Sequence, residues 1–218
     1  MRILRCIAVA IFIICVPAFL LTSNIRWAAN DIDLYQSGFE RYNVSQDTGF
    51  SDETLVNITK GLVSYFNSGE IDDTMAIFNQ DELAHLRDVK NLIELSYIIQ
   101  WVTLGYMVIF TIVGFVFKRR QFFHTCGIAF SAGSIAGIIG VSLVGIAALI
   151  NFDSLFRYFH RIFFRNDFWI SSGYLPRIFT EGFFYDVSKF IAVATVSEAM
   201  LIVLVAGFLI LRRRFTMN

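Results

Sequence analysis

Charged residues are scarce in this sequence. Asp, Glu, Lys and Arg make up only 17% of its 218 residues, whereas a soluble domain carries about 25%. Hydrophobic residues reach 56%, and the mean hydropathy is +0.61. The missing charge is concentrated in four long apolar runs. The composition therefore excludes an ordinary soluble enzyme and indicates an all-α protein that crosses a membrane several times.

Proline and cysteine are sparse as well. Two prolines in the whole chain leave few places for linkers or disordered tails. The three cysteines, Cys6, Cys15 and Cys126, all lie inside or beside apolar runs. Neither a structural disulfide nor a thiolate metal site is therefore expected in the polar segments.

The four apolar runs are each long enough to cross a bilayer, which takes roughly 20 residues in a helix. The predicted transmembrane helices cover residues 1–25, 93–117, 122–150 and 189–211. The first also resembles a signal peptide with a basic start, but its length favours an uncleaved anchor that Pro17 kinks. The third is rich in glycine, which predicts close approach to a neighbouring helix at Gly127, Gly133, Gly137, Gly140 and Gly145.

Basic residues predict the orientation, because short loops rich in Lys and Arg stay in the cytoplasm. Residues 23–90 hold twelve acids against five bases, whereas the short basic segments contain no acid. Both termini, the turn 118–121 and the tail 212–218 are therefore expected inside the cell. Residues 26–92 would form an extracellular cap, and 151–188 an extracellular aromatic-rich segment. The predicted fold class is an all-α membrane protein with four transmembrane helices and this cap.

Local patterns predict how the two extracellular segments fold. Ser51 begins a helix whose apolar positions recur at helical spacing, and Asn79 with Glu82 forms a capping box that opens a helix continuous to residue 117. Partial alternation over 31–39 indicates a strand or turn. In 151–188, aromatic residues at helical spacing alternate with Arg157, Arg161 and Arg165, a pattern typical of a helix at the headgroup level.

Two of the three histidines carry the sharpest functional prediction. His85 and His160 lie 75 positions apart, yet the topology places both on the outer side, each within about three helical turns of a span. Asp81 and Asp88 lie within reach of His85 on one helix face. His160 lies among phenylalanines, where desolvation favours the neutral base. Such a pair suits acid–base catalysis near pH 7. His124 falls on the cytoplasmic side and is set aside.

Other interpretations stay open at this point. Each histidine could be solvated or packed without a catalytic role, and His85, Asp88, His160 and Asp153 could together bind a metal ion. Glu198 lies within the fourth span, where a lone carboxylate is costly. It is either functional, protonated, or paired with Gln100 or Ser96.

Two motifs give the chain a family resemblance. The run Glu82-x-x-His85-x-x-Asp88-Val89-Lys90 leads into a span, and Phe159-His160-x-x-Phe163-Phe164-x-Asn166-x-x-Trp169 and Phe183-Phe184-x-Asp186 precede the last one. Together these resemble the lipoprotein intramolecular transacylases (Lit) of Gram-positive bacteria over nearly the whole chain. The sequence departs from the family where Pro176 and Glu181 are separated, since the family has Pro-Glu directly before the Phe-Phe pair.

The resemblance implies a membrane acyltransferase that moves the sn-2 acyl chain of a diacylglyceryl lipoprotein onto the α-amino group of its own N-terminal cysteine. His85 and His160 would be catalytic, with His160 as base and His85 with Asp88 as acid. Glu82 and Asp88 would support them. The expected substrate-binding residues are Phe159, Phe163, Phe164, Trp169, Phe183, Phe184 and Arg161.

The expected partners are diacylglyceryl-modified lipoproteins and membrane lipid, without a cofactor, a metal or nucleic acid, in a monomer of the cell membrane. Two other functions remain as alternatives. One is a metal-dependent membrane hydrolase that uses the same two histidines. The other is a non-catalytic accessory protein whose acidic cap docks a partner.

Overall fold

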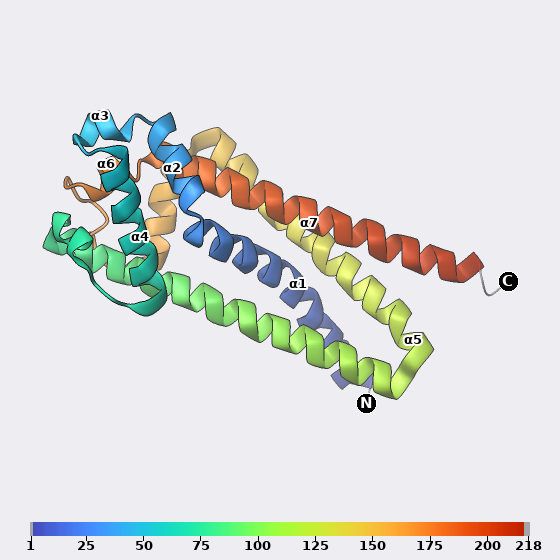
Figure 1. Ribbon diagram of the computed structural model, residues 1–218. Helices are drawn as coiled ribbons and strands as arrows, with labels where there is room; N and C mark the ends of the chain where they lie inside the picture. The colour runs from blue at the N-terminus through green and yellow to red at the C-terminus, as the bar shows by residue number, and fades with distance from the viewer. Residues whose placement is uncertain (1, 216–218) are drawn as a thin grey trace. The chain divides into compact units, whose positions relative to one another are not determined.

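The computed structural model describes residues 2–215, except for the side chains at 2, 118–121 and 212–215. Over residues 2–215 every element is a helix and no strand occurs (Figure 1). The elements are α1 (Arg2–Asn30), α2 (Ile32–Arg41), α3 (Val44–Thr48), α4 (Asp52–Ser68), the 3-10 helix η1 (Asp73–Ile77), α5 (Gln80–Phe163), α6 (Leu175–Ile178) and α7 (Glu181–Phe215).

Four helical stretches are long and apolar enough to cross a membrane, as the sequence predicts. They are Ile3–Asn30, Gln80–Phe117, Phe122–Phe163 and Glu181–Leu211. The second and third contain 38 and 42 residues, or about 57 and 63 Å of helix, which exceeds a hydrocarbon core of about 30 Å. Their charged turns therefore extend beyond the predicted spans. The basic turn at 118–121 and the tail at 212–218 lie outside the described side chains, so the orientation stays a prediction.

The chain divides into two compact units. Unit 1 comprises residues 1–24, 97–145 and 191–218, and unit 2 comprises residues 25–96 and 146–190. Within unit 1 the two limbs of α5 fold back on each other (Figure 1), and the Phe115 ring lies 5.3 Å from that of Phe122. The core of this unit is apolar and includes Phe12, Val16, Leu20, Met107, Phe122, Ala129 and Ala199.

Two glycines of the second α5 limb lie directly against α1. A Cβ added at Gly133 would lie 2.6 Å from the Ile13 carbonyl oxygen, and one at Gly137 would lie 2.9 Å from Cβ of Pro17. The predicted close approach is therefore confirmed at these two positions. It is wrong at Gly140 and Gly145, where an added Cβ would meet no described atom within 4 Å, since these residues lie beyond the contact with α1.

Unit 1 also contains a polar contact that involves the predicted intramembrane carboxylate. Asn24 is buried and donates from Nδ2 to Glu198 Oε2 at 2.8 Å and to Thr195 Oγ1 at 3.2 Å. Gln100, one of the partners considered for Glu198, donates to Ser23 at 3.0 Å. The structure thus adds Asn24 as a partner that the sequence did not suggest.

Unit 2 is built around α2, α4 and the ends of α5 and α7. The two predicted helix starts are confirmed, because Ser51 accepts from the Thr54 N–H and Asn79 forms a full capping box with Glu82. The four apolar positions of the predicted helical spacing, Leu55, Ile58, Leu62 and Phe66, are buried, and α4 also buries Thr59 and Tyr65. The core further includes Phe39, Met75, Phe78, Leu86, Ile178, Phe179 and Phe183.

The prediction of a strand or turn at residues 31–39 is wrong. This segment forms α2, and the Asp31 carboxylate caps it by accepting from the N–H groups of Asp33 and Leu34. The short alternating pattern fits a helix equally well, since Tyr35 and Phe39, four residues apart, both pack on the core of unit 2.

The aromatic segment after residue 150 is helical up to Phe163, as its spacing predicts. It has no helix start of its own, however, because it is the last part of α5. Whether it lies at the headgroup level stays a prediction.

Close contacts at glycine join α2 to the start of α7. A Cβ at Gly38 would lie 2.4 Å from the Phe183 ring, and one at Gly182 would lie 2.5 Å from the Tyr42 ring. The Tyr42 hydroxyl lies 2.7 Å from Asp186 Oδ2, and Arg41 forms an ion pair with the same carboxylate at 3.1 Å. These contacts fix the first turn of α7, which carries the predicted Phe183 and Phe184.

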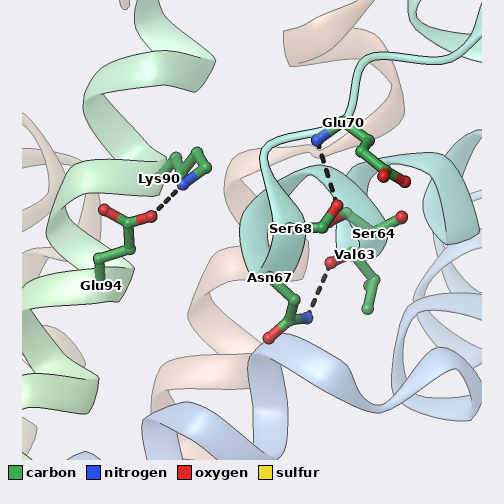
Figure 2. A network of polar contacts seen from close by, with 7 residues as sticks. All are labelled: Val63, Ser64, Asn67, Ser68, Glu70, Lys90 and Glu94. Atoms are coloured by element: carbon green, nitrogen blue, oxygen red, sulfur yellow. Dashed lines mark hydrogen bonds and ion pairs between the residues drawn. The ribbon is translucent and has the colours of Figure 1, made fainter.

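The C-terminal end of α4 is closed by local hydrogen bonds. Gly69 ends the helix in the left-handed conformation, Asn67 donates to the Val63 carbonyl at 2.8 Å, and Ser68 accepts from the Glu70 N–H at 3.1 Å (Figure 2). Figure 2 also shows the ion pair of Lys90 with Glu94 on α5. These bonds end α4 at Gly69, and the chain then continues to η1 and the start of α5.

Candidate active site

The two histidines meet at opposite ends of α5, within unit 2. His85 lies in the second turn of this helix and His160 in its last turn. Their ring centroids are 5.7 Å apart with an angle of 32° between the planes, and each residue is only 7% exposed. The structure thus brings together two imidazoles that are distant in sequence, shielded from bulk water.

The main chain fixes the tautomer of His160. Its Nδ1 lies 2.8 Å from the carbonyl oxygen of Phe156. A carbonyl oxygen only accepts, so Nδ1 carries the proton and donates it, and Nε2 of the neutral ring keeps its lone pair. Burial lowers the pKa of His160 from its ordinary value, although the bond to Phe156 partly opposes this. At neutral pH the residue is therefore a neutral base that presents Nε2.

His85 is held neutral more strongly. Its pKa is lowered to about 4, first by burial and then by the nearby His160, while the Asp88 carboxylate opposes both. Its Nδ1 is buried and has no hydrogen-bond partner among the residues that the structure describes. Leaving such an atom unpaired costs about 1–3 kcal/mol, so a group that satisfies it would bind favourably there.

Asp88, predicted to support His85, is bonded elsewhere. Its Oδ2 accepts from Asn166 Nδ2 at 2.8 Å, and Asn166 Oδ1 in turn accepts from the Phe168 N–H at 3.2 Å. Asp88 therefore influences His85 through its charge and not through a hydrogen bond to the buried Nδ1. Asp81, the other acid considered for this role, is exposed.

Glu82 is fully buried and organises the backbone next to the histidines. One carboxylate oxygen accepts from the Leu175 N–H at 2.7 Å, and the other from the Asn79 N–H at 3.0 Å. A Cβ at Gly173 would lie 2.4 Å from Glu82 Oε1, so only glycine fits beside the carboxylate. Glu82 thus holds the start of α5 and the segment before α6 together.

Aromatic rings surround His160. Its ring centroid lies 4.2 Å from that of Phe156, 4.9 Å from Trp169 and 5.3 Å from Phe164. Phe164 also contacts His85, at 4.8 Å. The Phe159 ring centroid lies 5.6 Å from that of His160. The result is a low-dielectric environment that accounts for the lowered pKa values of both histidines.

The remaining predicted substrate-binding residues take different places. Phe163 packs on Phe159 at 4.7 Å and is half exposed, and Phe184 lies 5.4 Å from Phe156. Phe183, by contrast, is buried in the core of unit 2. Arg161 is exposed at the end of α5. The sequence prediction named neither Phe156 nor Asn166 as a site residue. Phe156 could have been found among the aromatic residues at helical spacing, and Asn166 in the motif from Phe159 to Trp169.

The metal alternative gains no support from the geometry. Among the described residues there is no group of three or more His, Cys, Asp or Glu side chains that could hold an ion. Asp153, considered as a fourth ligand, instead forms an ion pair with Arg157.

Unit 1 contains an apolar pocket of about 380 Å³. Side chains of α1, α5 and α7 line it, among them Phe19, Met107 and Ile202.

A solved structure of the membrane integral lipoprotein intramolecular transacylase Lit from Bacillus cereus is similar to this chain, with a TM-score of 0.80 and 16% sequence identity. The match covers 99% of this chain and 100% of the relative. Structures of that protein with H85R and H85A mutations, in its own numbering, each match with a TM-score of 0.79 and 17% identity. They cover 96% of this chain and 93% and 94% of theirs. At such identities the likeness shows the fold.

A search of curated proteins by sequence finds no match. A comparison with protein families, however, matches residues 10–184 to the family described as lipoprotein intramolecular transacylase Lit. This match covers well over half of the chain, and the paired histidines lie inside it. The chain therefore belongs to the lipoprotein intramolecular transacylase family of multi-pass membrane enzymes.

Proposed function

We propose that this enzyme transfers the sn-2 acyl chain of a diacylglyceryl lipoprotein to the α-amino group of the lipoprotein's own N-terminal cysteine, with His160 as the general base. The observation that carries the proposal is the hydrogen bond from His160 Nδ1 to the Phe156 carbonyl, in a ring whose centroid lies 5.7 Å from that of the second buried imidazole, His85. Because this bond fixes the ring and its tautomer, Nε2 of His160 carries a free lone pair in a defined direction.

The reaction needs a proton to be moved and no external group. The amine nitrogen attacks the ester carbonyl carbon, its proton passes to His160 Nε2, and the C–O bond to glycerol breaks. His160 Nε2 then gives this proton to the departing glycerol oxygen, so that the amide and the free hydroxyl form and His160 returns to its neutral state. Positioned proton transfer of this kind contributes typically 10²–10⁴-fold in rate.

His85 acts as a neutral donor in this scheme. A residue with a pKa of about 4 carries almost no imidazolium at neutral pH, so it stabilises negative charge through an N–H group. A neutral imidazole can polarise a carbonyl in this way, and a donor aimed at the developing oxyanion in a water-poor site is worth several kcal/mol. The unpaired Nδ1 of His85 is the atom that supports this role.

The aromatic residues around His160 hold the acyl chains and exclude water. Direct transfer closes a medium-sized ring, which is entropically unfavourable unless the two ends are held together. Confinement can supply up to roughly 7–11 kcal/mol of the barrier in favourable cases. Phe159, Phe163, Phe164, Trp169 and Phe184 are the rings that serve this purpose.

The site faces the outer leaflet, and both termini lie in the cytoplasm. The charge asymmetry of the sequence supports this orientation. It also agrees with the substrate, since the proposed acceptor is a lipid-modified N-terminus that is held at a membrane surface.

The test uses the purified enzyme in vesicles with a diacylglyceryl lipopeptide that carries an isotopic label in the sn-2 chain. Mass spectrometry of the product should show the label as an amide on the cysteine nitrogen and a single chain on glycerol. His160→Gln should lower the rate by about 10²-fold or more, and His85→Gln by a similar factor. His124→Gln is the matched control and should leave the rate unchanged.

Three results would contradict the proposal. If the lipopeptide keeps its free amine and both chains, the proposed acyl transfer does not occur. If the label stays on glycerol while the amine is acylated, the sn-2 chain is not the one transferred. Release of free fatty acid that a chelator abolishes would favour the metal-dependent hydrolase.

A further inference from the structure

A short segment after α5 closes over the two histidines. We call residues 164–175 the strap. It is tied to the first turns of α5 at three points: Asn166 donates to Asp88 at 2.8 Å, Asn79 donates to Ser171 at 3.4 Å, and Leu175 donates to Glu82 at 2.7 Å. Between the first two ties the strap carries Trp169, whose ring lies 4.9 Å from that of His160.

Asn166 is the tie that reaches the chemistry. Its Nδ2 holds the Asp88 carboxylate, while its Oδ1 accepts from the Phe168 N–H and so fixes the turn that leads into Trp169. A single side chain therefore sets both the direction of an acid on α5 and the place of an aromatic ring on His160.

The alternative partner for Asp88 is close at hand. Asp88 follows His85 by three residues on the same helix, a spacing at which side chains meet. The His85 Nδ1 is buried and unpaired among the described residues, and a carboxylate would ordinarily fill such a position. What holds the Asp88 Oδ2 in another direction is the Asn166 amide.

We propose that Asn166 is a positioning residue of the acyl-transfer site, which keeps Asp88 off His85 Nδ1 and leaves that atom available to the substrate. The inference rests on the proposed function, because it assumes that His85 acts as a neutral donor. It goes beyond that function by naming the residue that prevents His85 from forming an ordinary histidine–carboxylate pair.

The charges around His85 give the consequence of losing this residue. The ionisable groups that face it are His160 from the far end of α5 and Asp88 from its own turn. Phe164, which packs on it, is neutral, and both oxygens of Glu82 are taken by backbone N–H groups. Among the side chains that the structure describes, Asp88 is thus the acid that could turn toward His85. Paired with Asp88, His85 would be charged at a higher pH and its Nδ1 would be occupied.

The experiment measures the pH dependence of kcat for Asn166→Ala in the vesicle assay. Release of Asp88 should raise the acidic limb of the profile by about one pH unit or more, the shift that an adjacent carboxylate commonly gives. We expect the ratio of kcat between the unaltered enzyme and Asn166→Ala to increase toward low pH, up to about tenfold on the acidic limb, with little change at pH 8. The control is Asn91→Ala, at an exposed position of α5 one turn after Asp88. It should keep both the rate and the pH profile.

A second variant separates positioning from simple loss of structure. Adding Asp88→Asn to Asn166→Ala removes the carboxylate that would pair with His85, so the acidic limb should return to its original pH or fall below it, even if the strap is looser. An acidic limb that stays in place in Asn166→Ala, whether kcat falls or not, would overturn the inference. So would a shifted limb that Asp88→Asn fails to restore.

This result is distinct from failure of the proposed function. If the unaltered enzyme makes no N-acylated product, the function itself is wrong. If the enzyme is active and Asn166→Ala keeps the original pH profile, only the positioning role is wrong. Thermal unfolding of both variants shows whether the protein is still folded after the strap has lost its bond to Asp88.

Discussion

Different interactions stabilise the interior of each of the two units of this protein. Unit 1 is packed from apolar side chains and from glycines that let α1 approach the second limb of α5. Unit 2 also has an apolar core, but hydrogen bonds donated by Asn79 and Asn166 and accepted by Glu82 fix its helix starts, its strap and its acids. One helix, α5, runs through both.

The difference shows how a membrane enzyme can separate folding from chemistry. In unit 1 a change of volume is costly, because close packing tolerates little extra bulk. In unit 2 a change of hydrogen-bonding capacity is costly, because buried polar atoms lose their partners. Substitutions that alter only one of these two properties can therefore test each unit separately.

The largest effect on stability is expected from Gly133→Leu in unit 1. Even a Cβ at this position would lie 2.6 Å from the Ile13 backbone oxygen, so α1 would have to move. We expect a loss of about 3 kcal/mol in the free energy of unfolding, measured by denaturation in detergent. Gly140→Leu, with no described atom within 4 Å, is the control. Equal losses in both variants would contradict the proposed contact with α1.

A smaller loss is expected from Glu82→Gln in unit 2. The glutamine oxygen can accept from only one of the two N–H groups, and its amide would face the other. We expect destabilisation of about 2 kcal/mol together with faster hydrogen exchange at Leu175 and Asn79. Glu53→Gln, at an exposed position on α4, should leave both measurements unchanged. If exchange at Leu175 is unaffected, Glu82 does not hold the strap.

The pH dependence of stability should come from unit 2 as well. The pKa of His85 falls from an ordinary value of 6.5 to about 4 on folding, and that of His160 is also lowered. Between these values the unfolded chain binds more protons than the folded one, so stability falls as the pH falls. Between pH 7.5 and 5.5 we expect a loss of about 1 kcal/mol from His85.

The double variant His85→Gln, His160→Gln should remove this part of the pH dependence. Thermal unfolding at the two pH values measures it. A slope that is unchanged in the double variant would show that the two imidazoles are not buried as neutral groups.

The smallest effect is expected from Asn24→Leu, which removes a polar contact inside unit 1. Hydrogen bonds between transmembrane helices average about 0.6 kcal/mol, so the bond from Asn24 to Glu198 should be worth a similar amount. The measurement is unfolding of the single variant, of Glu198→Leu and of the pair. Additive losses would show that the two side chains do not interact.

Local signals in the sequence predicted much of this fold. The starts of α4 and α5 follow from Ser51 and Asn79, because a capping side chain bonds to N–H groups only two or three residues away. The helix α2 was missed because its 10 residues make fewer than three turns, too few to distinguish a helix from a short strand by periodicity.

The meeting of His85 and His160 was predictable for a different reason. Each lies near the end of a predicted span, and helices that cross the same membrane bring their ends to the same level. The bonds from Asn166 to Asp88 and from Leu175 to Glu82 were not predictable. They join a loop to a helix 78 and 93 residues away, and no local pattern specifies which loop residue meets which acid.

The partner that sets the tautomer of His160 is a peptide carbonyl, that of Phe156. It belongs to the backbone, so every amino acid at position 156 that keeps the helix supplies the same acceptor. Scanning mutagenesis of side chains would therefore report the loss of a ring at Phe156 and miss the bond that orients the base. The helix backbone therefore determines the tautomer of His160, and substitutions of the side chain at position 156 do not change it.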